Sequence, residues 1–189
     1  MITKADIEEE LKGKEDFVKM DKLRRFLNNA DNLEIKKYIL LSLASINESK
    51  GMYNDAIKNV DVAIDLSLTF RDKKELAMKE TELWIKARQF DMADKGLLKA
   101  QSFGNSQERM EAELVYKDQY RAHAKNAENL GKHRLAIEFY EKLFQLKQPS
   151  EKKIEVKERL IDLYNRMGRI RDAERLKNMI IRDDFKPVY

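Results

Sequence analysis

The sequence predicts an all-α protein, an α-α superhelix in which helical hairpins stack as a solenoid behind an N-terminal helical cap. Three observations support this fold class. Apolar residues recur at helical spacing on both sides of a break at Gly51, with Leu40 and Leu43 before it and Ile57 and Val60 after it. Breaks of the same kind occur three more times. Of the 189 residues only 2 are Pro and 6 are Gly, which is typical of helical proteins.

The four breaks share a pattern that ends in alanine. Each has a turn residue, a variable residue and a large residue, and an Ala follows three positions after the large one. The turn residues are Gly51, Arg88, Gly131 and Gly168, the large residues are Tyr53, Phe90, His133 and Ile170, and the alanines are Ala56, Ala93, Ala136 and Ala173. The large residues lie 37, 43 and 37 positions apart. Because Gly tolerates the left-handed conformation that ends a helix, each break predicts a turn between antiparallel helices.

This pattern resembles the tetratricopeptide repeat, in a divergent form with an expanded period. The residues of the first copy that match the family's alternation of bulky and small positions are Leu40, Leu43, Ala44, Gly51, Tyr53, Ala56, Val60 and Ala63. Later copies depart from the family pattern: Lys177 occupies a bulky position in the fourth, and Pro149 lies one residue from the place of the closing Pro. The resemblance implies a right-handed helical solenoid that works as a protein-interaction module.

We expect a single solenoid domain. The four hairpins are expected at about 31–70, 71–104, 105–148 and 149–185, within residues 31–185. Residues 1–30 lack the repeat pattern, although Phe17, Met20 and Leu23 mark an amphipathic helix there. We interpret this segment as a cap that covers the apolar end of the stack, and the alternative is a detachable dimerisation arm.

Capping signals indicate where the first helix of each hairpin begins. Three pairs have the spacing of a capping box, namely Asp31 with Glu34, Asp72 with Glu75 and Asn105 with Glu108. After Asn105 no helix breaker occurs before Leu130, which predicts a helix of about 25 residues. Its extra turn either projects from the stack or packs against the loop at Phe103.

Two apolar features have alternative interpretations. The helix expected at about 32–50 carries apolar residues on more than one stripe. It is therefore either buried on several sides or leaves part of its surface for a partner. Trp84 shares a helical face with Ala77 and Thr81, and we interpret it as a core residue rather than a platform for a ligand.

The sequence contains no catalytic constellation. It has no Cys, which excludes disulfides, thiolate metal sites and cysteine nucleophiles. The two histidines, His123 and His133, lie ten positions apart and lack the spacing of a helical zinc pair. Gly-rich phosphate loops and a GxSxG nucleophile turn are also missing from the sequence. We therefore expect no enzymatic activity, no metal and no cofactor.

The composition indicates a soluble, cytoplasmic protein without a membrane segment. No apolar run reaches the roughly 18 residues that suggest a membrane helix, and the N-terminal MITKADIEEE is too charged for a signal peptide. The formal net charge of +4, from 38 basic and 34 acidic residues, is too small to indicate a nucleic-acid-binding protein by itself.

The family resemblance also implies a site for a protein partner. Tetratricopeptide-like proteins hold a peptide or helix in the concave groove formed by the first helix of each hairpin. Carried over by repeat position, the groove-facing residues are Tyr38, Leu41, Ser45, Met78, Lys79, Glu82, Arg121, Lys125, Arg159, Asp162 and Arg166. We expect the partner at the apolar, N-terminal half of this groove, unless the N-terminal cap covers Tyr38 and Leu41.

The basic C-terminal end suggests an alternative function. Residues 147–189 hold 12 Lys and Arg against 8 Asp and Glu. The basic residues around the last helix are Arg166, Arg169, Arg171, Arg175, Lys177 and Arg182. We interpret this end as a solvated terminal cap, and binding of an anion or nucleic acid is the alternative. The segment from Phe185 to Tyr189 is a loose end or a docking segment. A third alternative function is a structural subunit of a larger complex.

Overall fold

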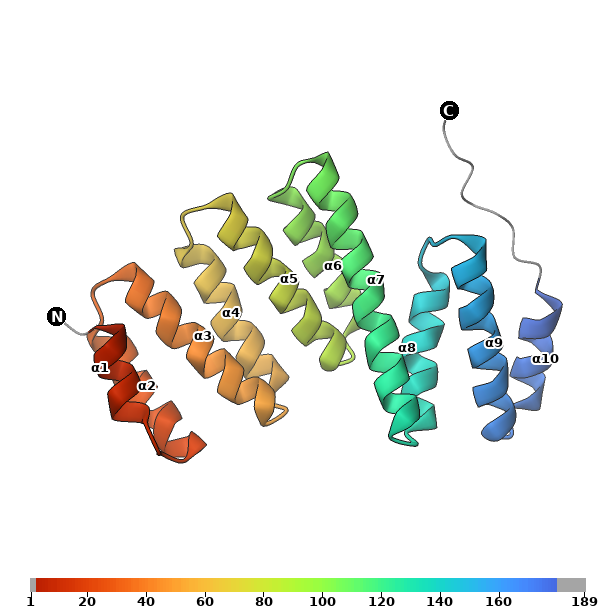
Figure 1. The fold of residues 1–189 in the computed structure, drawn as a ribbon, viewed down its shortest axis with the longest axis horizontal. Coiled ribbons are helices and arrows are strands. Elements are labelled where there is room, and N and C mark those ends of the chain that lie inside the picture. Colours follow the sequence, from red (N-terminus) through yellow and green to blue (C-terminus); the bar gives the residue numbers. More distant parts are fainter. Residues whose placement is uncertain (1–2, 180–189) are drawn as a thin grey trace. The chain divides into compact units, whose positions relative to one another are not determined.

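The computed structural model describes residues 3–179, and within this range the chain folds into helices without a strand (Figure 1). The helices are α1 (Lys4–Leu11), α2 (Asp16–Asn29), α3 (Leu33–Ser49), α4 (Tyr53–Leu66), α5 (Phe70–Lys86), α6 (Phe90–Ser102), α7 (Ser106–Asn129), α8 (His133–Gln145), α9 (Ser150–Arg166) and α10 (Ile170–Asn178). Neighbouring helices in the chain pack in pairs, as Figure 1 shows for α3 with α4 and α5 with α6. The predicted all-α class and the helical hairpins are confirmed.

The chain forms two compact units, residues 1–116 and 117–189. The boundary falls inside α7, so this helix contributes its first part to unit 1 and its second part to unit 2. Unit 1 holds the first three helix pairs, and unit 2 holds α8, α9 and α10. A single solenoid domain stays a prediction.

The four hairpin turns have the same backbone geometry. The turn residues Gly51, Arg88, Gly131 and Gly168 all have positive φ angles, between 60° and 72°. In each turn the N–H of the following residue donates to a carbonyl five positions back: Met52 to Asn47 (2.8 Å), Gln89 to Trp84 (3.0 Å), Lys132 to Ala127 (2.8 Å) and Arg169 to Tyr164 (2.8 Å). These bonds define the Schellman motif, which satisfies carbonyls left unpaired at a helix end. The predicted turns are therefore present at all four breaks.

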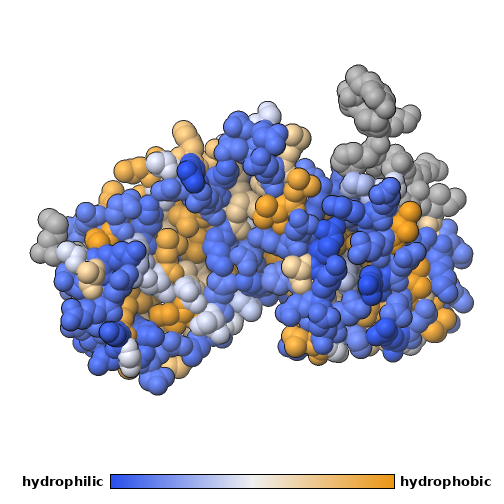
Figure 2. Space-filling view, in the orientation of Figure 1, coloured by the Kyte–Doolittle hydropathy of each residue, from blue (hydrophilic) through white to orange (hydrophobic). Residues whose placement is uncertain are grey.

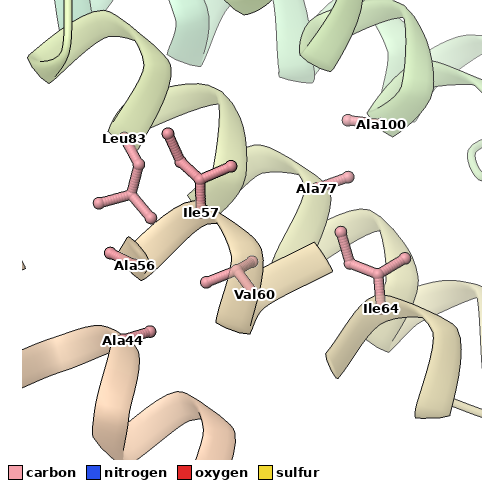
Figure 3. Packing of buried hydrophobic residues seen from close by; sticks show 8 residues of the cluster. All are labelled: Ala44, Ala56, Ile57, Val60, Ile64, Ala77, Leu83 and Ala100. Atoms are coloured by element: carbon pink, nitrogen blue, oxygen red, sulfur yellow. The ribbon is translucent and has the colours of Figure 1, made fainter. Parts of the chain in front are cut away.

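The alanines that follow the turns are buried in close helix contacts. Ala56, Ala93 and Ala136 are fully buried, and Ala173 is 1% exposed. In unit 1, Ala56 belongs to an apolar cluster whose members come from α3, α4, α5 and α6 (Figure 3). The members shown there are Ala44, Ala56, Ile57, Val60, Ile64, Ala77, Leu83 and Ala100. Small side chains thus let neighbouring helices approach closely while larger aliphatic residues fill the space between them.

Helices α5 and α6 approach closely at Gly96. A Cβ atom at this position would lie 2.6 Å from the hydroxyl oxygen of Thr81, which is buried and donates to the carbonyl of Ala77 at 2.8 Å. Because the threonine side chain is branched and held by this bond, it has little freedom to move aside. Gly96 therefore sets the spacing of the second hairpin.

Helices α1 and α2 cover one face of α3. Ile7, Met20 and Leu23 pack with Ile39 and Leu43 of α3 in a second buried cluster. Thr3 begins α1 through a capping box, in which its hydroxyl accepts from the N–H of Asp6 at 3.3 Å. The apolar side chains on this face of α3 are thereby removed from water.

Two of the predicted helix caps were wrong by one to three positions. Asn32, not Asp31, caps α3, since its side-chain oxygen accepts from the N–H of Glu34 at 2.8 Å. Thr69, not Asp72, caps α5, and its hydroxyl accepts from the N–H of Asp72 at 3.1 Å. Asn, Asp and Thr all serve as N-caps, so composition alone does not select among neighbours.

The third predicted cap and the long helix that follows it are confirmed. Asn105 and Glu108 form a reciprocal capping box, with N···O distances of 2.9 and 3.0 Å. Helix α7 then runs for 24 residues. Its first turn contacts the end of α6 and the loop that follows it, because the Arg109 guanidinium donates to the carbonyls of Gln101 in α6 (3.0 Å) and Gly104 in the loop (3.1 Å).

Replacing Ala136 with Leu is expected to lower the free energy of unfolding by about 1–3 kcal/mol, because the added carbons overpack a fully buried site. Ala122→Leu is the matched control, since Ala122 is exposed on α7 and Ala and Leu have similar helix propensities. Denaturant unfolding measures both effects. Equal effects of the two substitutions would contradict a close helix contact at Ala136.

Candidate protein-interaction surface

In unit 1 the predicted groove residues lie on two helices. Tyr38, Leu41 and Ser45 are on α3, and Met78 is on α5 together with Lys79 and Glu82. Leu41 and Met78 are half-buried against the cluster drawn in Figure 3, whereas Ser45 is exposed. Figure 2 shows hydrophobic side chains gathered between α3 and α5 with hydrophilic ones around them. This surface of α3 and α5, centred on Leu41, Ser45 and Met78, is called the α3–α5 face below.

Tyr38 is held by the N-terminal helix. Its hydroxyl donates to Glu8 at 3.0 Å, and the ammonium of Lys4 lies 4.7 Å from the centre of its ring. Burial, followed by the hydrogen bond to Glu8, raises the pKa of Tyr38 above its ordinary value. Helix α1 therefore occupies part of the surface that Tyr38 would offer to a partner.

A four-charge cluster joins α3 to α5. The ammonium of Lys79 lies 2.9 Å from Glu48 and 3.2 Å from Glu82, and Lys86 contacts the same two carboxylates. Two positive and two negative groups leave the cluster without net charge. Its side chains are at most 39% exposed, so the pairs are shielded from water better than ordinary surface ion pairs.

The cluster changes the ionisation of its members. Burial opposes the charged form of Glu48, but hydrogen bonds from Lys86 and Lys79 outweigh it and hold the pKa of Glu48 below its ordinary value. Burial likewise opposes ionisation of Glu82, whose pKa the contacts with Lys86 and Lys79 lower. For Lys86, burial is outweighed by bonds to Glu48 and Glu82, which raise its pKa. All three stay charged near neutral pH.

Glu48 and Lys86 were not among the site residues predicted from the sequence. The spacing of Glu82 and Lys86, four positions apart on one helix, could have indicated that pair. No local spacing connects Glu48 to α5, because that contact depends on how the two hairpins pack.

Further ion pairs connect the first helices of successive hairpins in unit 1. Lys37 of α3 lies 3.1 Å from Asp72 of α5, and Lys74 of α5 pairs with Glu108 of α7. The two lysines are separated by one repeat of 37 positions, and both acids lie in the first turn of their helix. The bond from Lys37, opposed by burial, lowers the pKa of Asp72. The same cross-link therefore recurs from one hairpin to the next.

In unit 2 four of the five predicted groove residues are engaged in ion pairs. Arg121 pairs with Asp118 on α7, and Arg166 lies 2.8 Å from Asp162 on α9. Arg159 of α9 is 3.7 Å from Glu128 of α7, which connects the two helices. Lys125 is exposed on α7.

The basic C-terminal cluster is partly neutralised. Arg166 pairs with Asp162, and Arg169 lies 2.7 Å from Asp172 and 3.6 Å from Glu141. Among residues 3–179 no carboxylate pairs with the remaining predicted members Arg171, Arg175 and Lys177, which are exposed. Arg182 and the segment from Phe185 to Tyr189 lie outside the described residues.

The histidines occupy packing positions in unit 2. The ring of His123 lies 5.5 Å from that of Phe139, and the Nδ1 atom of His133 is buried without a hydrogen-bond partner in the described part of the chain. Within that part, no three His, Asp or Glu side chains are grouped to hold a metal ion. None of the helices there combines the length and apolarity that crossing a bilayer requires.

The pKa directions of Glu48 and Glu82 predict acid sensitivity. Because the folded-state values lie below the ordinary value of 4.5, the ionised carboxylates stabilise the fold above that pH, and this contribution is lost as the pH falls through the folded-state values. We expect Glu48→Gln to lower the melting temperature at pH 7 by about 1–3 °C and to differ less from the wild type at pH 3.

The matched control is Glu75→Gln, which removes an exposed carboxylate that pairs with Arg71 on the same helix. The melting temperature of Glu75→Gln should equal that of the wild type at both pH 7 and pH 3. Thermal melts between pH 3 and 7 measure all three proteins. A constant difference between Glu48→Gln and the wild type across this range would contradict the linkage.

Comparison with known proteins gives likenesses among solved structures but none among protein families or curated proteins. No protein-family model matches the sequence, and no curated protein matches it. The crystal structure of MamA is similar over 93% of this chain and 91% of its own, with 19% sequence identity and a TM-score of 0.43.

Proposed function

We propose that the chain is a non-catalytic protein-interaction scaffold that binds a peptide or helix of a partner protein on the α3–α5 face. The observation that carries this proposal is that ion pairs hold α3 and α5 together while leaving the middle of the face uncharged. Along α3, Lys37 precedes Leu41 and Ser45 and pairs with Asp72 of α5. Glu48 follows Leu41 and Ser45, and belongs to the cluster with Lys79, Glu82 and Lys86 of α5.

The side chains in the middle of the face suit a partner helix. Ser45 follows Leu41 by one helical turn and is small, so another backbone has room to approach α3. Leu41 and Met78 each present a half-buried apolar surface. A methionine adapts its shape to irregular partners, and partly exposed apolar groups surrounded by polar ones are common at interfaces.

Fixed spacing between the two helices favours binding. A partner that meets a preformed surface does not have to order it, and the entropic cost of association falls accordingly. The four charges already satisfy one another, so the partner need not neutralise them. We therefore place the strongest contacts at Leu41, Ser45 and Met78 of unit 1.

The substitution Ser45→Arg tests the proposal. A long charged side chain in the middle of the face should weaken partner binding by at least about 2 kcal/mol, near thirtyfold, with little change in melting temperature because Ser45 is exposed. The matched control is Ser102→Arg, the same change at an exposed position of α6. Proteins captured from a lysate of the source organism by each variant are compared with those captured by the wild type.

The proposal requires partners that are retained by Ser102→Arg and lost with Ser45→Arg. Equal retention by both variants would contradict a site on this face. Treatment of the lysate with nuclease distinguishes the alternative function. Loss of every partner after that treatment would favour nucleic-acid binding by the basic C-terminal end, whereas stoichiometric capture unaffected by either substitution would favour a structural subunit.

A further inference from the structure

The part of α7 that belongs to unit 1 carries apolar side chains on two opposite faces. Ala112 and Tyr116 are buried, and the hydroxyl of Tyr116 donates to Asp94 of α6 at 2.6 Å. Met110 and Leu114 lie two positions before and after Ala112, and they are 57% and 56% exposed. Because residues two positions apart lie on nearly opposite sides of a helix, these two side chains point away from the packed interior. Packing within unit 1 therefore accounts for only one of the two apolar faces.

Met110 and Leu114 form a short apolar ridge. They lie four positions apart, so their side chains are neighbours on the helix surface. Figure 2 shows hydrophobic side chains along this part of α7. Gln107 and Glu111, both exposed, share this face of the helix and border the ridge with polar groups. We call the set of Met110, Glu111 and Leu114 the α7 ridge. An apolar surface with a polar border is typical of a protein-interaction site.

The carboxylate of the α7 ridge is available to a cation. Glu111 accepts a hydrogen bond from the side-chain amide of Gln107 at 3.1 Å, and no cationic side chain pairs with it among residues 3–179. The charged groups next to it are already engaged. Glu108 pairs with Lys74 of α5, and Arg109 donates to backbone carbonyls. Charge complementarity therefore favours a positively charged group beside the ridge.

We propose that the α7 ridge binds an amphipathic helix of a partner protein that carries Lys or Arg beside its apolar face. The apolar side chains of this helix pack around Met110 and Leu114, because rows of side chains one turn apart fit between those of another helix. Met110 adapts its shape to the partner, and the cation of the partner pairs with Glu111 and sets the register. The α7 ridge shares no residue with the α3–α5 face, so this inference holds whether or not that face binds a partner.

Fluorescence anisotropy of the full chain with two labelled synthetic peptides tests the proposal. Both peptides are amphipathic helices of about four turns with Leu along one face, and the opposite face carries Lys in one peptide and Glu in the other. We expect the Lys peptide to bind at least about tenfold more tightly than the Glu peptide. Leu114→Ser should weaken binding of the Lys peptide about tenfold. Leu98→Ser is the matched control at a 65% exposed leucine of α6, and it should leave this binding unchanged.

A second pair of variants tests the carboxylate. Glu111→Gln should weaken binding of the Lys peptide by about two- to fivefold, the range of an exposed ion pair. Its matched control is Asp65→Asn, which removes an exposed carboxylate of α4 that also lacks a cationic partner in the described part of the chain. This control should not change the binding, and equal effects of the two variants would show that net charge alone attracts the peptide.

Three further outcomes would overturn the proposal. They are equal affinity for the two peptides, no binding of the Lys peptide at about 100 μM, and equal effects of Leu114→Ser and Leu98→Ser. Binding of the Lys peptide that is lost with Ser45→Arg but retained with Leu114→Ser would also overturn it. The peptide would then lie on the α3–α5 face, so the proposed function would stand while the α7 ridge would not.

Discussion

A left-handed residue at each hairpin turn is the constraint on which the rest of the fold depends. In all four hairpins the chain reverses between two helices at one residue of positive φ. The N–H of the next residue then donates a hydrogen bond to the carbonyl five positions back. The left-handed conformation costs an ordinary L-residue about 1–2 kcal/mol, and Gly escapes this cost. Arg88 adopts it at φ 60°, which indicates that the surrounding packing determines the turn even where the sequence does not favour it.

The turns determine which side chains of neighbouring helices contact one another, and these contacts determine how successive hairpins pack. Because each second helix begins at an equivalent point, its alanine reaches the same depth in every hairpin, and neighbouring helices pack closely there. In unit 1 the lysines Lys37 and Lys74 then stand at equivalent positions and reach the first turn of the next hairpin. The proposed α3–α5 face lies between one of these cross-links, Lys37 with Asp72, and the four-charge cluster that also joins α3 to α5.

The sequence predicted features that depend on local backbone geometry. The turns at Gly51, Gly131 and Gly168 carry a residue suited to positive φ. The turn at Arg88 lacks Gly, and the alanine three positions after the large residue identified it. The caps of α3 and α5 were displaced because several neighbouring residues could serve. The pairing of Glu48 with Lys79 and Lys86 could not be predicted, because it depends on the packing of two hairpins rather than on spacing along one helix. The sequence left open whether the N-terminal cap covers Tyr38, because that contact also depends on packing between helices, and α1 does contact this side chain.

The most direct test of the turn constraint is the stability of two substitutions at Gly131. Apart from Gly131 itself and its two chain neighbours, no atom of the described residues lies within 4 Å of the position that a Cβ would take there, so a substitution changes backbone preference without a clash. We expect Gly131→Ala to lower the free energy of unfolding by about 1 kcal/mol, and Gly131→Asn to lower it by less than half as much, because Asn tolerates positive φ. Denaturant unfolding that finds Gly131→Ala as stable as the wild type would contradict it.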